Sequence, residues 1–446
     1  MPTQHTGSAF TRRGFLGVAG GVAAATALAA CSSPSSKGGS SGGGSSSPIK
    51  FWNQVWGNNG FNALDKSITL GYKPAKGLPS VTYQVIQWAN FTQTYSSAVA
   101  SNTNPAISSG GGTQAFLFEA QGKIAYADHL YESWKKNGLY DDFLPGLIDT
   151  LKTKNGYAAI PYNNDMRVLW YSKSLLAKAG VQPPTDWTSF EKVCAALKKI
   201  GVYGYGTYAG AGGYTGQHNI VSHMINNGGG LFDAHHQPNC VTPANIEAVE
   251  WVLGLVKNGY VDPRSLTYTG ENAQSQWKAK KYGMGFDTGG LADNLGGTFA
   301  TDVVPARPLV GPHGGKGALF FPNNIMLYKH TSSQAGAEAF ATYYYKNMAP
   351  LWTKNTGIGL PPLKSIVATP EFQKNKNAVK IINEWLPISK AWGAPGQNAN
   401  FLNVTIADAT PAMNTFTQSI LGGRTTAKAA LTALQAALKP LAKPNG

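Results

Sequence analysis

Segments with strand periodicity alternate with segments of helix periodicity from Ile49 onward, and this alternation limits the fold more than any other feature. Ile49 to Trp52 begins a strand, and residues 81–88 alternate apolar and polar side chains as a second strand would. Residues 91–100 then have the spacing of a helix. Such alternation is typical of α/β domains, so we expect largely parallel sheets covered by helices.

Later segments carry the start signals and apolar spacing of amphipathic helices. Thr188 can cap one helix, with Glu191 three residues further on. Further helices are expected at residues 246–257, 333–345 and 426–438. About 400 residues follow the N-terminal region, which is enough for two domains with sizeable cores.

The N-terminal region has the features of an export signal. Arg12 and Arg13 form a positive stretch, and the uncharged residues 14–30 are too few for a comfortable membrane span. The pair Arg12-Arg13 looks like a twin-arginine signal, although the general secretory route stays open. Leu28 to Cys31 resembles a lipobox, in which the Cys is acylated and becomes the first residue of the mature protein. The alternative is an ordinary secretory signal with an incidental Cys.

Residues 32–48 are nearly all Ser and Gly. Such a segment cannot bury enough apolar surface to order itself, so we expect a flexible tether. The chain has a formal charge of +15, and removal of Arg12 and Arg13 with the signal leaves +13. Because the lysines occur at most in scattered pairs such as Lys198-Lys199, a surface that faces an anionic envelope is favoured, and no nucleic-acid partner is expected.

Two cysteines, Cys194 and Cys240, remain once Cys31 is assigned to the lipid. An oxidising compartment would permit a disulfide between them. However, Cys194 lies in the middle of an expected helix, where a small buried thiol is equally plausible. Both alternatives stay open.

Several motifs occur in a fixed order along the chain. They are Gly156 to Tyr162, Asp165, Val168 to Lys173, Trp187 to Phe190, Asn227 to Asp233, Asn258 to Pro263, Trp277 to Met284, Pro305 to Gly315 and Thr356 to Pro362. Each motif is weak alone, but the ordered series covers nearly all of residues 49–440. It resembles family 1 extracellular solute-binding proteins, which are the carbohydrate receptors of ABC importers.

The resemblance implies an α/β fold of the periplasmic-binding-protein type, with two lobes, a hinge and a ligand cleft between the lobes. The implied parts are a signal peptide at 1–30, a lipidated tether at 31–48, an N-terminal lobe at 49–163 and 306–347, and a C-terminal lobe at 164–305 and 348–446. The importer's membrane subunits would detect closure of the lobes around the ligand, with the ATPase on separate chains.

Such a protein binds a mono- or oligosaccharide reversibly, without chemistry. We therefore expect no enzyme activity, no cofactor and no metal site. We also expect a monomer, held at the outer face of the cytoplasmic membrane through a lipid on Cys31.

A sugar offers apolar faces and many hydroxyl groups, so its site needs aromatic rings beside planar polar side chains. Trp52, Asn53 and Trp56 follow the first strand, at the edge where open α/β sheets bind ligands. The family's pattern, with Arg167 added as a neighbour of Asp165 on an extended strand, places further contacts at Thr113, Gln114, Asp165, Arg167, Tyr214, Gln217, His218, Asn219, Asp287, Gly289, Asn324 and Phe401. Gly290 stands where the family has a stacking Trp, so a stacking ring is expected elsewhere, and Phe401 is a candidate.

Two other functions stay open. The same fold could bind a polyamine, an amino sugar or a glycerol-phosphate compound, a choice that Asp165, Arg167 and Asp287 do not settle. An exported glycosidase would need two carboxylates beside the sugar bond, and Asp165 and Asp287 are the only pair we would nominate. The glycine-rich residues 204–209 and 311–316 lack the context of nucleotide-binding loops.

Overall fold

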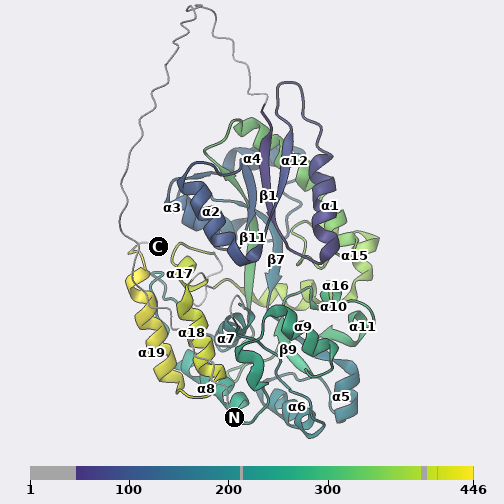
Figure 1. Ribbon diagram of the computed structural model, residues 1–446, viewed down its shortest axis with the longest axis vertical. Helices are drawn as coiled ribbons and strands as arrows, with labels where there is room; N and C mark the ends of the chain where they lie inside the picture. Colours follow the sequence, from purple (N-terminus) through teal and green to yellow (C-terminus); the bar gives the residue numbers. More distant parts are fainter. Residues whose placement is uncertain (1–46, 211–213, 393–398, 409, 445–446) are drawn as a thin grey trace, which may run out of the picture. The chain divides into compact units, whose positions relative to one another are not determined.

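The computed structural model describes residues 47–210, 214–392, 399–408 and 410–444 (Figure 1). The expected signal peptide, Cys31 and almost all of the expected tether lie outside these residues. Across the part of the chain that is described, no helix is both long and apolar enough to cross a membrane.

The larger sheet has the strand order β12-β11-β3-β1-β2. Strand β1 (Ile49–Gln54) pairs in parallel with β2 (Val81–Ile86) and β3 (Ile107–Gly110), as predicted. Strand β11 (Ala318–Tyr328) instead runs antiparallel to β3 and to β7 (Ile160–Met166). The prediction of largely parallel sheets fails here because the chain leaves this sheet along β7 and returns along β11. Two short strands also pair with β11, namely β4 (Ile124–Ala125) and β12 (Ser389–Lys390).

Helices cover both faces of the larger sheet. They are α1 (Asn59–Leu70), α2 (Phe91–Ala100), α3 (Gln114–Ala120), α4 (Asp128–Asn137) and α12 (Gln334–Asn347). Phe51 packs against Phe340 of α12, with ring centroids 5.2 Å apart. The next residue, Trp52, points to the other face, where its ring lies edge-on to Tyr95 of α2 at 5.6 Å. Successive side chains of a strand point to opposite faces, so β1 joins two separate cores.

The smaller sheet has the order β10-β8-β9. Both pairings in it are antiparallel, and its strands are β8 (Val168–Ser172), β9 (Met284–Asp287) and β10 (Val303–Pro305). The helices around it are α5 (Lys173–Ala179), α6 (Trp187–Lys199), α7 (Thr215–Asn226), α8 (Pro243–Lys257), α9 (Gly270–Lys278), α18 (Pro411–Leu421) and α19 (Ala427–Leu438). Every residue of α7 is buried, so this helix is the centre of the second region.

Shorter elements complete the described part of the chain. The hairpin strands are β5 (Lys152–Thr153) and β6 (Gly156–Tyr157), and the short helices are α10 (Leu291–Leu295), α11 (Phe299–Asp302), α13 (Pro350–Thr353), α14 (Lys364–Val367), α15 (Pro370–Lys374), α16 (Lys376–Glu384) and α17 (Val404–Asp408). Single 3-10 turns lie at Trp88–Asn90, Ile148–Leu151, Pro263–Leu266, Leu386–Ile388 and Lys439–Leu441.

The predicted helices are present, with one change in capping. Ser333 and Thr426 cap α12 and α19. The cap of α6 is Asp186 and not Thr188: its side chain accepts from the backbone N–H of Ser189 at 2.7 Å, and the Ser189 hydroxyl accepts from the backbone N–H of Asp186 at 3.0 Å. A carboxylate that is free to reach the third helical N–H therefore begins the helix two residues earlier than predicted.

Of the two alternatives for Cys194 and Cys240, the structure has free thiols, and both are buried. Cys194 packs against Gly204, where an added Cβ would lie 2.5 Å from the sulfur. Burial raises the pKa of the Cys240 thiol to about 12.

Candidate functional site

A cavity of about 320 Å³ lies where strands of both sheets end. Trp56 follows β1, Trp88 follows β2, Gly111 follows β3 and Thr288 follows β9, and all four line the cavity. The carboxyl ends of strands are where open α/β sheets bind ligands. Residues of β7, β11, α7 and α17 also contribute to the lining.

Three aromatic residues form one side of the cavity, and we call Trp56, Trp88 and Phe91 the aromatic wall. The rings of Trp56 and Trp88 meet edge to face at 4.8 Å, and those of Trp88 and Phe91 at 5.0 Å. The indole N–H of Trp88 donates to the carbonyl of Val55 at 2.5 Å, and that of Trp56 donates to Oδ1 of Asn53 at 2.9 Å. The rings are therefore held in place before any ligand arrives.

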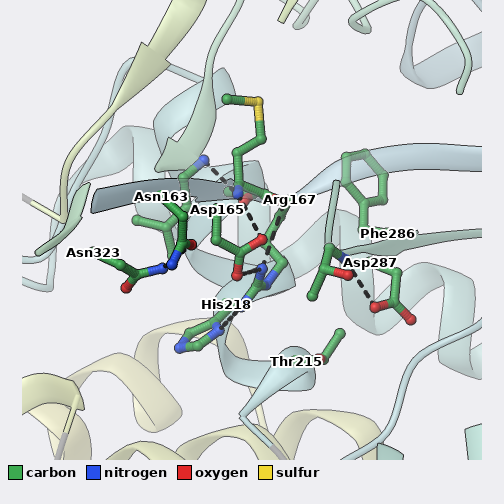
Figure 2. A network of polar contacts seen from close by, with 12 residues as sticks. Asn163, Asp165, Arg167, Thr215, His218, Phe286, Asp287 and Asn323 are labelled. Carbon is green, nitrogen blue, oxygen red and sulfur yellow. Dashed lines mark hydrogen bonds and ion pairs between the residues drawn. The ribbon is translucent and has the colours of Figure 1, made fainter. Parts of the chain in front are cut away.

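Four polar side chains that line the cavity are linked in series, and we call Asp165, Arg167, His218 and Asp408 the polar relay. Nη1 of Arg167 donates to Oδ2 of Asp165 at 2.7 Å, and Nη2 lies 2.8 Å from Nδ1 of His218. Nε2 of His218 lies 3.1 Å from Oδ1 of Asp408. Figure 2 shows Asp165, Arg167 and His218 side by side, joined by these interactions.

The relay fixes the tautomer of His218. A guanidinium can only donate, so Nδ1 of His218 accepts from Arg167 and Nε2 carries the proton that is donated to Asp408. Burial, and next the positive charge of Arg167, lower the pKa of His218 to about 4. His218 is therefore neutral at physiological pH, and the relay as a whole carries one negative charge.

Arg167 is almost completely buried at the edge of the cavity. Its side chain is 6% exposed, and the guanidinium carbon lies 4.8 Å from the ring centroid of Phe321. Phe321 also contacts the imidazole of His218, with centroids 4.6 Å apart. Among the described residues, no group of three or more His, Cys, Asp or Glu side chains is placed to hold a metal ion.

Seven of the residues singled out from the sequence line the cavity. They are Trp56, Thr113, Gln114, Asp165, Arg167, Tyr214 and His218. Tyr214 is 41% exposed, and its ring stacks on the imidazole of His218 at 6.1 Å. An aromatic face that is only half covered by protein can receive the apolar face of a sugar.

The other candidates on the larger sheet have different contacts. Trp52 packs in the core against Tyr95, because it lies on the strand and not beyond its end. Asn53 donates to Oδ2 of Asp65 at 2.6 Å behind the aromatic wall. Asn324 donates to the carbonyl of Gly111 at 3.2 Å and so supports the loop that lines the cavity.

The remaining candidates also lie outside the lining. Gln217 is buried on α7, and Asn219 donates to the carbonyl of Phe286 at 3.1 Å. Gly289 faces a smaller neighbouring cavity. Asp287 accepts from the backbone N–H of Thr288, and burial raises the pKa of the Asp287 carboxyl to about 6.

Neither Gly290 nor Phe401 provides a stacking ring. An added Cβ at Gly290 would lie 2.5 Å from the carbonyl oxygen of Gly357, so a Trp does not fit there. Phe401 stacks on His236 at 3.9 Å, away from the cavity lining. The aromatic wall and Tyr214 offer rings in their place.

The sequence analysis did not single out several lining residues, among them Trp88, Phe91, Asn163, Tyr208 and Asp408. Trp88 is the last residue of the predicted strand 81–88, so the rule that was applied at the end of the first strand would have found it at the end of the second. Asp408 carries no comparable signal, because its partner His218 is 190 residues away in the sequence.

Comparisons with known proteins agree with this geometry. Residues 75–349, more than half of the chain, match the family described as bacterial extracellular solute-binding protein. A putative binding protein of Brucella abortus is 22% identical over 291 residues, which cover 63% of this chain and 68% of that protein. The sn-glycerol-3-phosphate-binding periplasmic protein of Rhizobium meliloti is 24% identical over 233 residues, covering 47% of this chain and 51% of that protein.

Solved structures have the same two-lobed fold. A sugar transporter from Arthrobacter chlorophenolicus with bound laminaribiose is 46% identical, with a TM-score of 0.84, and the match covers 89% of this chain and all of that chain. Maltose-bound MalE3 of T. maritima is 16% identical with a TM-score of 0.73, over 89% of this chain and all of that chain, and so supports the fold alone. The chain therefore belongs to the family of bacterial extracellular solute-binding proteins.

Proposed function

We propose that this protein is the receptor of an ABC importer and reversibly binds an uncharged mono- or oligosaccharide in the cavity. The observation that carries this proposal is the lining itself, in which an aromatic wall and a relay of polar groups share one cavity. The rings can cover the C–H faces of a sugar, and the polar groups can bind its hydroxyls. A cavity of about 320 Å³ is at the small end of the range for ligand sites, which favours a short saccharide.

The charges in the cavity favour a neutral ligand over a phosphate compound. Arg167 is the one Lys or Arg side chain among the described lining residues, and its two terminal nitrogens already bind Asp165 and His218. The internal segments that are not described, 211–213, 393–398 and 409, contain no Lys or Arg. A phosphate would find no free cation and would face two carboxylates, Asp165 and Asp408, although one relative binds glycerol phosphate.

The same contacts argue against the other two alternatives. A polyamine carries at least two positive charges, whereas the relay offers one uncompensated negative charge because Arg167 already pairs with Asp165. A glycosidase would need two carboxylates on either side of a sugar bond. Of the nominated pair, Asp165 is bound to Arg167 and Asp287 lies outside the lining.

The relative with bound laminaribiose gives the first ligand to test. The whole of that relative matches 89% of this chain at 46% identity. Laminaribiose is an uncharged disaccharide of two glucose units. We therefore propose a short glucoside as the ligand class. A ligand that touches both lobes would stabilise their closed arrangement, which the importer's membrane subunits would detect.

The lobes that would close comprise residues 49–163 with 306–347, and 164–305 with 348–446. The division is supported by the strand pairings, because β8, β9 and β10 form a sheet of their own. A lipid on Cys31 and the Ser/Gly tether would keep the receptor close to its importer and raise the effective concentration. The protein would act as a monomer, outside the cytoplasmic membrane.

A thermal-shift screen against neutral sugars, phosphate esters and amines tests the proposal. Ligand at 100 times its Kd adds about 2.7 kcal/mol to the free energy of unfolding, which is a readily measured rise in Tm. We expect a rise with laminaribiose or a related short glucoside. A rise with phosphate esters or amines, and none with any sugar, would refute the proposal.

A further inference from the structure

A buried polar cluster lies behind the aromatic wall. At its centre is Asp65 of α1, which is fully buried. Its Oδ2 accepts from the amide of Asn53 at 2.6 Å, and its Oδ1 accepts from the hydroxyl of Tyr344 at 2.5 Å. The hydroxyl of Tyr162 lies 2.9 Å from that of Tyr344. A carboxylate at full burial is costly to fold, so a purely structural role for Asp65 would be better filled by an apolar side chain.

The carboxylate determines which way the Asn53 amide points. An ionised carboxylate can only accept hydrogen bonds, so the NH₂ group of Asn53 must face Asp65. Oδ1 of Asn53 then points the other way, where it accepts from the indole N–H of Trp56 at 2.9 Å and from the backbone N–H of Gln54 at 3.0 Å. If the amide turned over, an NH₂ group would face the indole N–H and this bond would be lost.

The indole that Asn53 holds lines the cavity. Trp56 meets Trp88 edge to face at 4.8 Å, so a change in the orientation of Trp56 also moves the next ring of the aromatic wall. Its second acceptor, the hydroxyl of Ser109, is more distant at 3.3 Å and can rotate. Asn53 is therefore the partner that sets the position of this ring.

We propose that Asp65 is a positioning residue for ligand binding, which holds the Trp56 ring in its binding orientation by fixing the direction of the Asn53 amide. This inference rests on the proposed function, because it assigns Trp56 a ligand face. Asp65 itself does not line the cavity. Burial raises the pKa of Asp65 to about 6, so the side chain is ionised at pH 8, where the experiment is done.

The test is calorimetric titration of the purified chain with laminaribiose at pH 8. We expect Asp65→Leu to weaken binding at least tenfold. We expect Asp65→Asn to bind within about threefold of the wild type, because its amide oxygen can accept from Asn53 while the hydroxyl of Tyr344 rotates to accept from its NH₂. Asn245→Ala is the control: Asn245 is fully buried and donates to the carbonyls of Gly230 and Cys240, so its loss lowers Tm and leaves Kd unchanged.

A double-mutant cycle separates positioning from general damage. If Asp65 acts through Trp56, then Asp65→Leu has no further effect on Kd in a Trp56→Phe background. If Asp65→Leu does not fold, Asn53→Ala removes the middle link and is expected to give the same loss and the same non-additivity.

Two results would overturn the inference: a folded Asp65→Leu chain with wild-type Kd, or losses from Asp65→Leu and Trp56→Phe that add. Both leave the proposed function intact, because the wild type still binds sugar. A wild type that binds no sugar overturns the proposed function, and this inference with it.

Discussion

The aromatic wall and the polar relay face the same cavity but are built differently. The wall is built at one edge of the sheet: Trp56 follows β1, Trp88 and Phe91 follow the neighbouring strand β2, and their rings present apolar faces. The relay joins Asp165 on β7 and the adjoining Arg167 to the distant helices α7 and α17, and the positive charge of Arg167 is paired within the protein. Rings can cover many sugars, whereas a relay with no free cation selects against anions. Affinity should thus come mainly from the wall, and both selectivity and the integrity of the site from the relay.

Removal of Arg167 should have the largest effect. Arg167→Ala leaves Asp165 and Nδ1 of His218 without their donor in a largely buried site. Breaking a buried ion pair costs about 3–5 kcal/mol, and because Asp165 is 20% exposed we expect about 3 kcal/mol of stability. Sugar binding should fall more than 100-fold. Chemical denaturation and calorimetry measure both losses, with exposed Arg307→Ala as the control. Unchanged binding by a folded Arg167→Ala chain would show that the relay does not contribute to sugar binding.

Truncation of Trp88 should weaken binding without changing selectivity. Covering about 80 Å² of ring surface contributes about 2 kcal/mol, so Trp88→Ala is expected to raise Kd about 30-fold for every sugar that binds. Titration with a panel of sugars measures the ratios between ligands. Trp251 stacks on Trp187 outside the cavity, so Trp251→Ala should lower Tm only. A Trp88→Ala chain whose sugar preference changes would show that the wall also selects.

A pair of substitutions at His218 tests the hydrogen-bond pattern of the relay. His218→Ala removes an acceptor for Arg167 and a donor to Asp408, and two such bonds are together worth about 1.5 kcal/mol, or about tenfold in Kd. In His218→Gln, the amide can accept from Arg167 and donate to Asp408, so Kd should stay within about threefold of the wild type. Equal losses in both variants would mean that the imidazole ring contacts the ligand directly.

The pH dependence of stability gives the smallest effect. The pKa of His218 is about 4 in the folded chain and 6.5 when unfolded, so the unfolded chain binds more protons between these values. Stability is therefore complete above pH 6.5 and falls as the pH drops toward 4. Between pH 7 and pH 5.5 the loss from this group is about 1 kcal/mol.

His218→Gln should remove that part of the loss in urea denaturation at the two pH values. Burial also lowers the pKa of His223 to about 3, but His223 is present in both chains and cancels in the comparison. Equal losses in the two chains would mean that His218 is not held neutral.

The sequence predicted the local features and not the long-range ones. Strand and helix periodicity located β1, β2 and α2, and the rule that ligands bind past the ends of strands located Trp56. The same rule does not separate Trp52 from Trp56, because both are aromatic and only the strand end decides which one packs in the core. The antiparallel direction of β11 depends on how the chain returns to the sheet, which no local pattern encodes.

The relay could be predicted only in part for the same reason. Asp165 lies on β7 and Arg167 directly follows the end of that strand, two residues further on, so their pairing follows from the spacing of an extended chain. The contact of His218 with Asp408 depends on how α17 packs near α7, and neither helix carries a signal for the other. Asp287 was singled out, but the residues that line the cavity are its neighbours Thr288 and Gly290, in the turn just past the end of β9.

The most direct test of the account is one calorimetric comparison of laminaribiose with sn-glycerol 3-phosphate on the wild-type chain. An uncharged sugar held between the wall and the relay should bind with a Kd near or below about 1 μM, which corresponds to about −8 kcal/mol. The phosphate ester should give no measurable heat, because Arg167 is already bound on both sides. Binding of the phosphate ester together with failure of the sugar would contradict the central claim.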